Sequence, residues 1–223
     1  MKGRILLKAL AKFVFGFLLV MILVFLPAGS FDYWNGWVFI GILFIPMFVI
    51  GIVLIIKNPE LLEKRLNAKE SGSEQKEVIF LSGIMFVAGF VTAGLNYRFR
   101  WLIMPDWTVI LFSVIFLLSY LMYAEVLREN TYLSRTVEIQ NNQRVIDTGL
   151  YGIVRHPMYS ATILMFLSIP LMLGSFISFL IFLIYPFIIV KRIRNEETVL
   201  ESGLEGYTDY KKKVKYRLVP FLW

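Results

Sequence analysis

The chain has 223 residues, of which 58% are hydrophobic and 17% are charged, and its formal net charge is +7. A soluble domain is nearer half apolar and a quarter charged, so this composition indicates that lipid forms part of the solvent and excludes a disordered or collagen-like chain. Because the chain has no Cys, a disulfide framework, a thiolate nucleophile and a Cys-ligated metal site are excluded as well.

Four long uncharged runs follow a basic N-terminal segment, and each approaches the roughly 20 residues that a helix needs to cross a bilayer. They are residues 13–31, 33–56, 78–97 and 107–124. We therefore expect four transmembrane helices within residues 1–124. The cytoplasmic loop at 57–77 is predicted to be helical over 59–69 and flexible at 71–73, and we assign it no chemistry.

A fifth apolar run, residues 158–190, is too long for a single span at about 1.5 Å per residue. Gly174 and Ser175 divide it into two arms of nearly equal length, and this pair is typical of a tight turn. The sequence thus predicts a helical hairpin of two short spans. The expected fold is an all-α, polytopic membrane helical bundle of about six membrane segments with a cytoplasmic cofactor pocket.

Basic residues are distributed asymmetrically in this topology. Of the 23 Lys and Arg residues, all fall on one side of the predicted membrane except Arg98 and Arg100. Under the positive-inside rule the crowded side is cytoplasmic, so we expect a multi-pass integral membrane protein with both termini in the cytoplasm. In a prokaryote this would be the cell inner membrane. Topology and anionic lipid explain the positive charge, and no nucleic-acid motif accompanies it.

Residues 125–223 form the second predicted region, with a loop before the hairpin and a cytoplasmic tail after it. The loop gives a weak β-hairpin signal, because β-like stretches at 136–140 and 144–146 flank a turn at Asn141 and Asn142.

Polar side chains gather at both ends of the apolar hairpin. The sets before and after it are Arg155, His156 and Tyr159, and Arg192, Glu196 and Glu197. Equal arms would return the second set to the membrane face of the first, and Arg192 and Glu196 share one helix face at i and i+4. Each group alone is explained equally well as a snorkelling anchor or a surface charge, but their co-location favours a functional site.

Several reaction classes lack their motifs. The chain has no G-x-G-x-x-G after a strand, no Walker A sequence and no H-E-x-x-H. A single His without any Cys makes a transition-metal site improbable, so no metal is expected. The spans are apolar through their centres and polarity gathers at one edge. This pattern favours an enzyme with a lipid-dissolved substrate over a transporter.

The motifs of this region resemble those of the isoprenylcysteine carboxyl methyltransferase and phospholipid methyltransferase superfamily. The superfamily signature is R-H-P-x-Y, an apolar stretch, and E-E. Here it is matched by Arg155-His156-Pro157-Met158-Tyr159 and Glu196-Glu197, with Gly149-Leu150-Tyr151 upstream. The resemblance covers roughly residues 125–223. Leu150 stands where many members have Pro, and Ser160-Ala161 follow Tyr159 where many have x-Gly, which loosens any inference about the substrate.

The resemblance implies an integral membrane methyltransferase that binds S-adenosylmethionine without a Rossmann domain. The cofactor-binding residues that it implies are Gly149, Tyr151, Arg155, His156, Pro157, Tyr159, Glu196 and Glu197. It also implies that Arg192 and Glu196 are catalytic, with Arg192 near the reacting carboxylate. Tyr207, Tyr210, Leu218 and Pro220 are predicted to fold back over the adenine. The expected partners are membrane lipid and a lipophilic small-molecule or prenylated substrate, while the oligomeric state is not indicated.

The chemistry of the cofactor agrees with these residues. Its sulfonium and amino groups are cationic and need carboxylates such as Glu196 and Glu197, whereas its carboxylate needs donors such as Arg155 and the backbone near His156. Carboxyl O-methylation of an isoprenylcysteine-like acceptor is the favoured reaction, with Arg192 orienting the acceptor. The alternatives are N-methylation of a phosphatidylethanolamine-type lipid, an NADPH-dependent membrane reductase, and a non-catalytic scaffold.

Overall fold

The computed structural model describes residues 2–66, 73–133, 137 and 139–223. Within these ranges the chain is helical and contains no strand. The helices are α1 (Lys2–Ala28), α2 (Trp34–Lys57), α3 (Pro59–Leu66), α4 (Ser73–Phe99), α5 (Asp106–Glu129), the 3-10 turn η1 (Gly149–Gly152), α6 (Pro157–Met172), α7 (Phe176–Phe182), α8 (Tyr185–Gly203) and α9 (Tyr207–Lys213).

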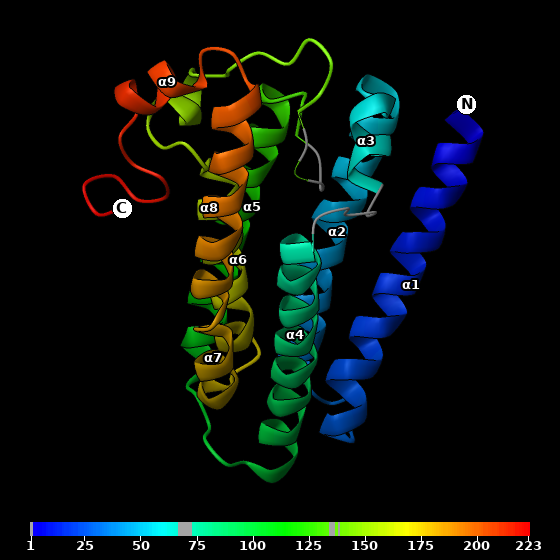
Figure 1. The fold of residues 1–223 in the computed structure, drawn as a ribbon. Coiled ribbons are helices and arrows are strands. Elements are labelled where there is room, and N and C mark those ends of the chain that lie inside the picture. Colours follow the sequence, from blue (N-terminus) through cyan, green and yellow to red (C-terminus); the bar gives the residue numbers. More distant parts are fainter. Residues whose placement is uncertain (1, 67–72, 134–136, 138) are drawn as a thin grey trace.

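The predicted polytopic helical bundle is confirmed. Five helical stretches of the described chain are long and apolar enough to cross a membrane, namely Gly3–Ala28, Trp34–Lys57, Gln75–Phe99, Asp106–Glu129 and Phe176–Gly203. The shorter apolar α6 packs mainly against α5 and forms the first arm of the hairpin. Figure 1 shows both termini at the end of the bundle where α3 and α9 lie. Arg98, in the last turn of α4, and Arg100, just after this helix, lie at the opposite end.

The hairpin turns where the sequence predicts. Gly174 has φ +72°, a left-handed conformation that favours glycine, and the Ser175 side chain caps α7 by accepting from the backbone N–H of Ser178 at 3.2 Å. The second arm is itself divided, because α7 ends at Phe182 and α8 restarts with Pro186 in its first turn. Proline lacks the N–H that would continue the preceding helix. The two arms therefore return the chain to the end of the bundle that holds α9 (Figure 1).

Two predictions for the loops need correction or fall outside the described residues. The strand predicted at 144–146 is wrong, because these residues have no regular structure and their side chains face a pocket. An isolated two-stranded hairpin is marginal without a packed face. The turn at Asn141 and Asn142 is present, but residues 136 and 138 of the other predicted stretch are not described. In the 57–77 loop, α3 confirms the helix as far as Leu66, and residues 67–72 are not described.

Candidate active site

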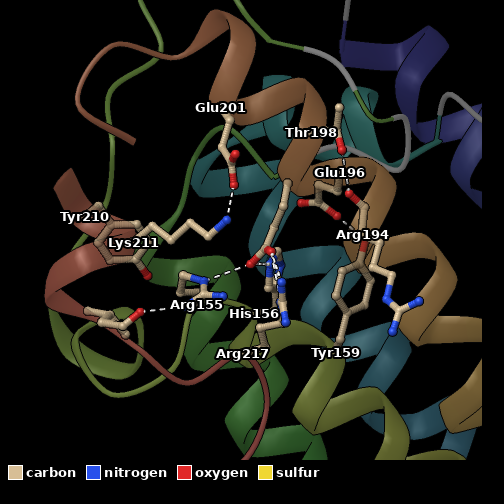
Figure 2. Close-up of polar contacts among 12 residues, drawn as sticks. Arg155, His156, Tyr159, Arg194, Glu196, Thr198, Glu201, Tyr210, Lys211 and Arg217 are labelled. Atoms are coloured by element: carbon tan, nitrogen blue, oxygen red, sulfur yellow. Dashed lines mark hydrogen bonds and ion pairs between the residues drawn. The ribbon is translucent and has the colours of Figure 1, made fainter. Parts of the chain in front are cut away.

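The two polar clusters at the ends of the hairpin are in direct contact. The Tyr159 hydroxyl, in the first turn of α6, donates to Glu196 Oε2 at 2.5 Å and accepts from Arg192 Nε at 2.8 Å. Arg192 and Glu196 are one turn apart on α8, so one phenol bridges a cation and an anion from the same helix face. The fold-back inferred from arm length therefore brings these three predicted residues together, and Figure 2 shows Tyr159 beside Glu196.

Glu197 is the centre of a second, buried cluster. Its Oε1 accepts from Arg155 Nε at 2.8 Å and lies 3.3 Å from His156 Nε2, and its Oε2 accepts from Arg217 Nε at 2.9 Å. The Glu197 and Arg155 side chains are each only 4% exposed. Burying a lone carboxylate is costly, and here three basic groups surround it. Figure 2 shows Arg155, His156 and Arg217 close to one another.

The C-terminal tail packs against the N-terminal end of α6. Backbone N–H groups of Arg155 and His156 donate to the carbonyls of Tyr216 and Arg217, each at 2.9 Å. The Arg155 guanidinium also donates to the carbonyls of Val214 at 2.7 Å and Lys215 at 2.8 Å. Helix N-termini leave such N–H groups unsatisfied unless a partner arrives. The N–H groups expected to face an anionic ligand are instead occupied by the tail.

A pocket opens beside these clusters, between the described residues of the 130–146 segment, η1, α8, α9 and the N-terminal end of α6. Its cavity volume is about 110 Å³. Six of the predicted site residues line it, namely Tyr151, Arg155, His156, Tyr159, Arg192 and Glu196.

The other three predicted residues lie outside the pocket lining. Glu197 is buried and is not part of the pocket lining. Pro157 begins α6, and Gly149 begins η1 with φ +51°. This left-handed φ favours glycine, and a Cβ atom on Gly149 would lie 2.4 Å from the Glu129 carboxylate oxygens, which would have to move. Their contacts support the pocket wall, and a direct role in binding remains a prediction.

The tail also supplies pocket residues. Tyr207 and Tyr210 of α9 line the pocket, whereas Leu218 and Pro220, which were predicted to cover the same ligand, do not. The Tyr210 hydroxyl donates to the Tyr151 carbonyl at 2.8 Å. Sequence analysis did not anticipate Arg217 as a partner of Glu197, because nothing in the local pattern of the tail indicates where it returns.

The Tyr207 hydroxyl is the clearest candidate for a ligand-binding group. Tyr207 is 4% exposed, lines the pocket, and its hydroxyl has no hydrogen-bond partner in the described structure. Burial raises the pKa of Tyr207, and the negative charges of Glu197 and Glu196 raise it further. The phenol therefore remains protonated and can donate to a molecule in the pocket. Buried polar groups are nearly always paired, so an unpaired one in a pocket indicates a binding position.

Amide and carboxylate groups complete the chemistry of the site. Asn130 lines the pocket and donates to the Tyr151 hydroxyl at 2.9 Å, and the pocket also includes Gln143. No cluster of three metal-binding side chains occurs among the described residues. The pocket thus offers Glu196 to a cation, and amide and phenol groups to a polar ligand.

Comparison with known protein families finds a match to the region that holds the hairpin. Residues 108–202 match the model of the isoprenylcysteine carboxyl methyltransferase (ICMT) family. The match covers less than half of the chain, so this region is similar to the ICMT family. It starts in α5 and ends in α8, so it contains the whole hairpin and every cluster residue except Arg217, and it confirms the resemblance seen in the motifs.

A curated protein of different activity is also similar. A segment of 91 residues, 40% of this chain, is 28% identical to the Delta(14)-sterol reductase TM7SF2 of Mus musculus. The match covers only 22% of that reductase.

Proposed function

We propose that this protein is an integral membrane methyltransferase that uses S-adenosylmethionine and modifies a lipophilic acceptor. The observation that carries the proposal is the joining of the two ends of the hairpin that matches the ICMT family into one pocket that presents a carboxylate, Glu196. The basic end of the bundle, which holds the pocket and both termini, is proposed to face the cytoplasm.

The pocket residues fit S-adenosylmethionine, which when bound supplies a methyl group activated by a positively charged sulfur. Glu196 would hold its cationic groups. The unpaired Tyr207 hydroxyl and the Asn130 and Gln143 amides would contact its polar groups. Because its oxygens are engaged by Arg155, His156 and Arg217, Glu197 would act by holding the pocket wall.

The favoured acceptor is the carboxylate of an isoprenylcysteine-like molecule. Its oxygen would form a bond to the methyl carbon while the carbon–sulfur bond breaks and its electron pair returns to sulfur. A carboxylate carries no proton that must leave, so Arg192 needs only to orient it and the pocket to exclude water. An amine acceptor such as phosphatidylethanolamine would also have to lose a proton to a base.

Calorimetry on the purified protein tests the cofactor. We expect S-adenosylhomocysteine to bind and NADPH not to bind. Glu196→Gln should weaken S-adenosylhomocysteine binding by about 2–4 kcal/mol, because a charged contact is lost in a partly desolvated pocket. The matched control is Glu201→Gln, on the same helix, whose carboxylate pairs with Lys211 at the surface. Equal affinity of both variants would refute the role of Glu196.

The acceptor is found by methyl transfer itself. Membrane extract incubated with the protein and methyl-labelled S-adenosylmethionine should yield a labelled lipophilic ester that mild base cleaves. A base-stable label on an amine lipid would instead establish N-methylation.

The similarity to a sterol reductase supports a second candidate, an NADPH-dependent membrane reductase. Binding of NADPH without binding of S-adenosylhomocysteine would establish that candidate and overturn the methyltransferase.

A further inference from the structure

Arg65 lies near the end of α3, outside the residues that match the ICMT family, yet it contacts the first turn of α6. Its Nη1 lies 3.8 Å from Met158 Sδ, and its guanidinium carbon is 5.6 Å from the centroid of the Tyr123 ring. A second guanidinium nitrogen donates to the Tyr123 hydroxyl. Met158 lines the pocket and Arg65 does not, so this arginine contacts the pocket wall from outside, from a segment distant in sequence.

Two contacts of the residues that precede Arg65 fix the position of α3. Leu61 is buried in one apolar cluster with Val126 and Leu127 of α5. Lys64 Nζ donates to Gln140 Oε1, in the loop that borders the pocket, at 2.6 Å. The helix therefore holds the guanidinium at a defined place, which lowers the entropy lost when a ligand binds.

Two arginines flank one turn of α6. Arg65 contacts Met158 and Arg192 contacts Tyr159, and these consecutive α6 residues both line the pocket.

The charge of Glu196 makes a second cation necessary for an anionic acceptor. The Tyr159 hydroxyl links Glu196 to Arg192, so the positive charge of Arg192 is partly balanced by the negative charge of Glu196. An acceptor carboxylate placed near Arg192 would also be repelled by Glu196 at this short range. A guanidinium from another side would offset this repulsion, and its planar fork suits a carboxylate.

We propose that Arg65 and Arg192 together form the anion-binding end of the acceptor site, with Arg65 as an acceptor-binding residue supplied by α3. This inference rests on the proposed function. It assigns α3 to the substrate site, and it predicts selection for carboxylate acceptors over amine acceptors by charge.

The test compares Arg65→Gln, Arg65→Lys and the control Arg128→Gln, a surface arginine that pairs with Glu125. The probes are S-adenosylhomocysteine, N-acetyl-S-farnesylcysteine as acceptor, and its methyl ester as an uncharged competitor. Arg65→Gln should raise the KM for the acid about 10- to 100-fold. Its affinities for S-adenosylhomocysteine and for the ester should stay within about twofold of wild type. Arg65→Lys should recover only part of the loss, because an ammonium group lacks the planar fork.

Each outcome separates the inference from the proposed function. If wild type does not bind S-adenosylhomocysteine, the proposed function and this inference both fail. If it binds and methylates the acid, but Arg65→Gln keeps a wild-type KM, only the inference is overturned. Equal weakening of the acid and the ester also overturns it, since Arg65 would then act through packing. A melting temperature for every variant identifies misfolding, and Arg65→Lys provides the folded comparison.

Discussion

The bundle joins its helices in two different ways. α1 and α4 meet through a glycine, since a Cβ atom on Gly94 would lie 2.7 Å from the Val24 carbonyl oxygen and 2.9 Å from the Ala28 nitrogen. The N-terminal end of α6 and the C-terminal half of α8 are joined instead by Glu197 and the basic groups around it. The first contact depends on close backbone approach and the second on balanced buried charge.

The difference follows from the medium around each contact, which is lipid between the spans and water at the helix ends. Between spans, lipid is as apolar as the side chains, so association relies on close van der Waals packing of small residues. At the joined ends of α6 and α8, ionic groups are removed from water and are stable only while each has its partner. We therefore expect the first contact to be sensitive to added volume and the second to loss of charge.

Loss of the Glu197 charge should have the largest effect. Glu197→Gln leaves the buried Arg155 guanidinium without its counter-ion, and we expect about 3–5 kcal/mol of destabilisation. Denaturant unfolding in detergent measures it. Glu201→Gln, which removes an exposed ion pair on the same helix, should cost no more than about 1 kcal/mol. Similar losses of unfolding free energy in the two variants would show that the buried cluster contributes no more to stability than an exposed ion pair.

Added volume at Gly94 should come next. Gly94→Ala places a methyl group against the α1 backbone, and overpacking of this kind costs about 1–3 kcal/mol. The same unfolding assay should show this loss, while affinity for S-adenosylhomocysteine stays at the wild-type value. Gly83→Ala is the matched control, because its Cβ atom would meet no atom within 4 Å. If Gly94→Ala were harmless, close packing would not hold α1 to α4.

Two pocket tyrosines should separate ligand binding from stability. Tyr207→Phe removes an unpaired hydroxyl, so stability should be unchanged or slightly higher, while S-adenosylhomocysteine binding weakens by about 1 kcal/mol. Tyr210→Phe removes a hydroxyl that donates to the Tyr151 carbonyl, so it should lower stability by a similar amount. Calorimetry and unfolding on both variants check the contrast. Undiminished ligand binding by Tyr207→Phe would contradict the binding position assigned to its hydroxyl.

The smallest effect is expected at the exposed pair of Asp147 and Lys213. A hydrogen bond from Lys213, together with its charge, holds the pKa of Asp147 below its ordinary value. A lowered folded-state pKa adds stability above the unfolded value of about 3.9, and this contribution disappears as pH falls through the folded value. The melting temperatures of wild type and Asp147→Asn should therefore differ slightly at pH 7 and converge in acid. A difference that grows in acid would contradict this sign.

Much of the architecture follows from local sequence properties. Run lengths predict the spans because bilayer thickness sets helix length, and Gly174 marks the turn because a left-handed φ is accessible to glycine. The contact of Tyr159 with Arg192 and Glu196 was predictable for the same reason, since arms of similar length on a fixed turn return to one level.

The site itself needed the tertiary structure. The residue pattern at 144–146 favoured a strand, but these side chains face the pocket, and no pattern separates the partly buried carboxylate of Glu196, which lines the pocket, from the buried one of Glu197. Nor does the sequence show that Arg217 returns to Glu197 or that Arg65 reaches Met158, because both contacts join distant segments. The sequence by itself determined which segments lie in lipid and which residues end the hairpin. Only packing decided which charges are buried together, because that depends on the partner that each side chain meets in space.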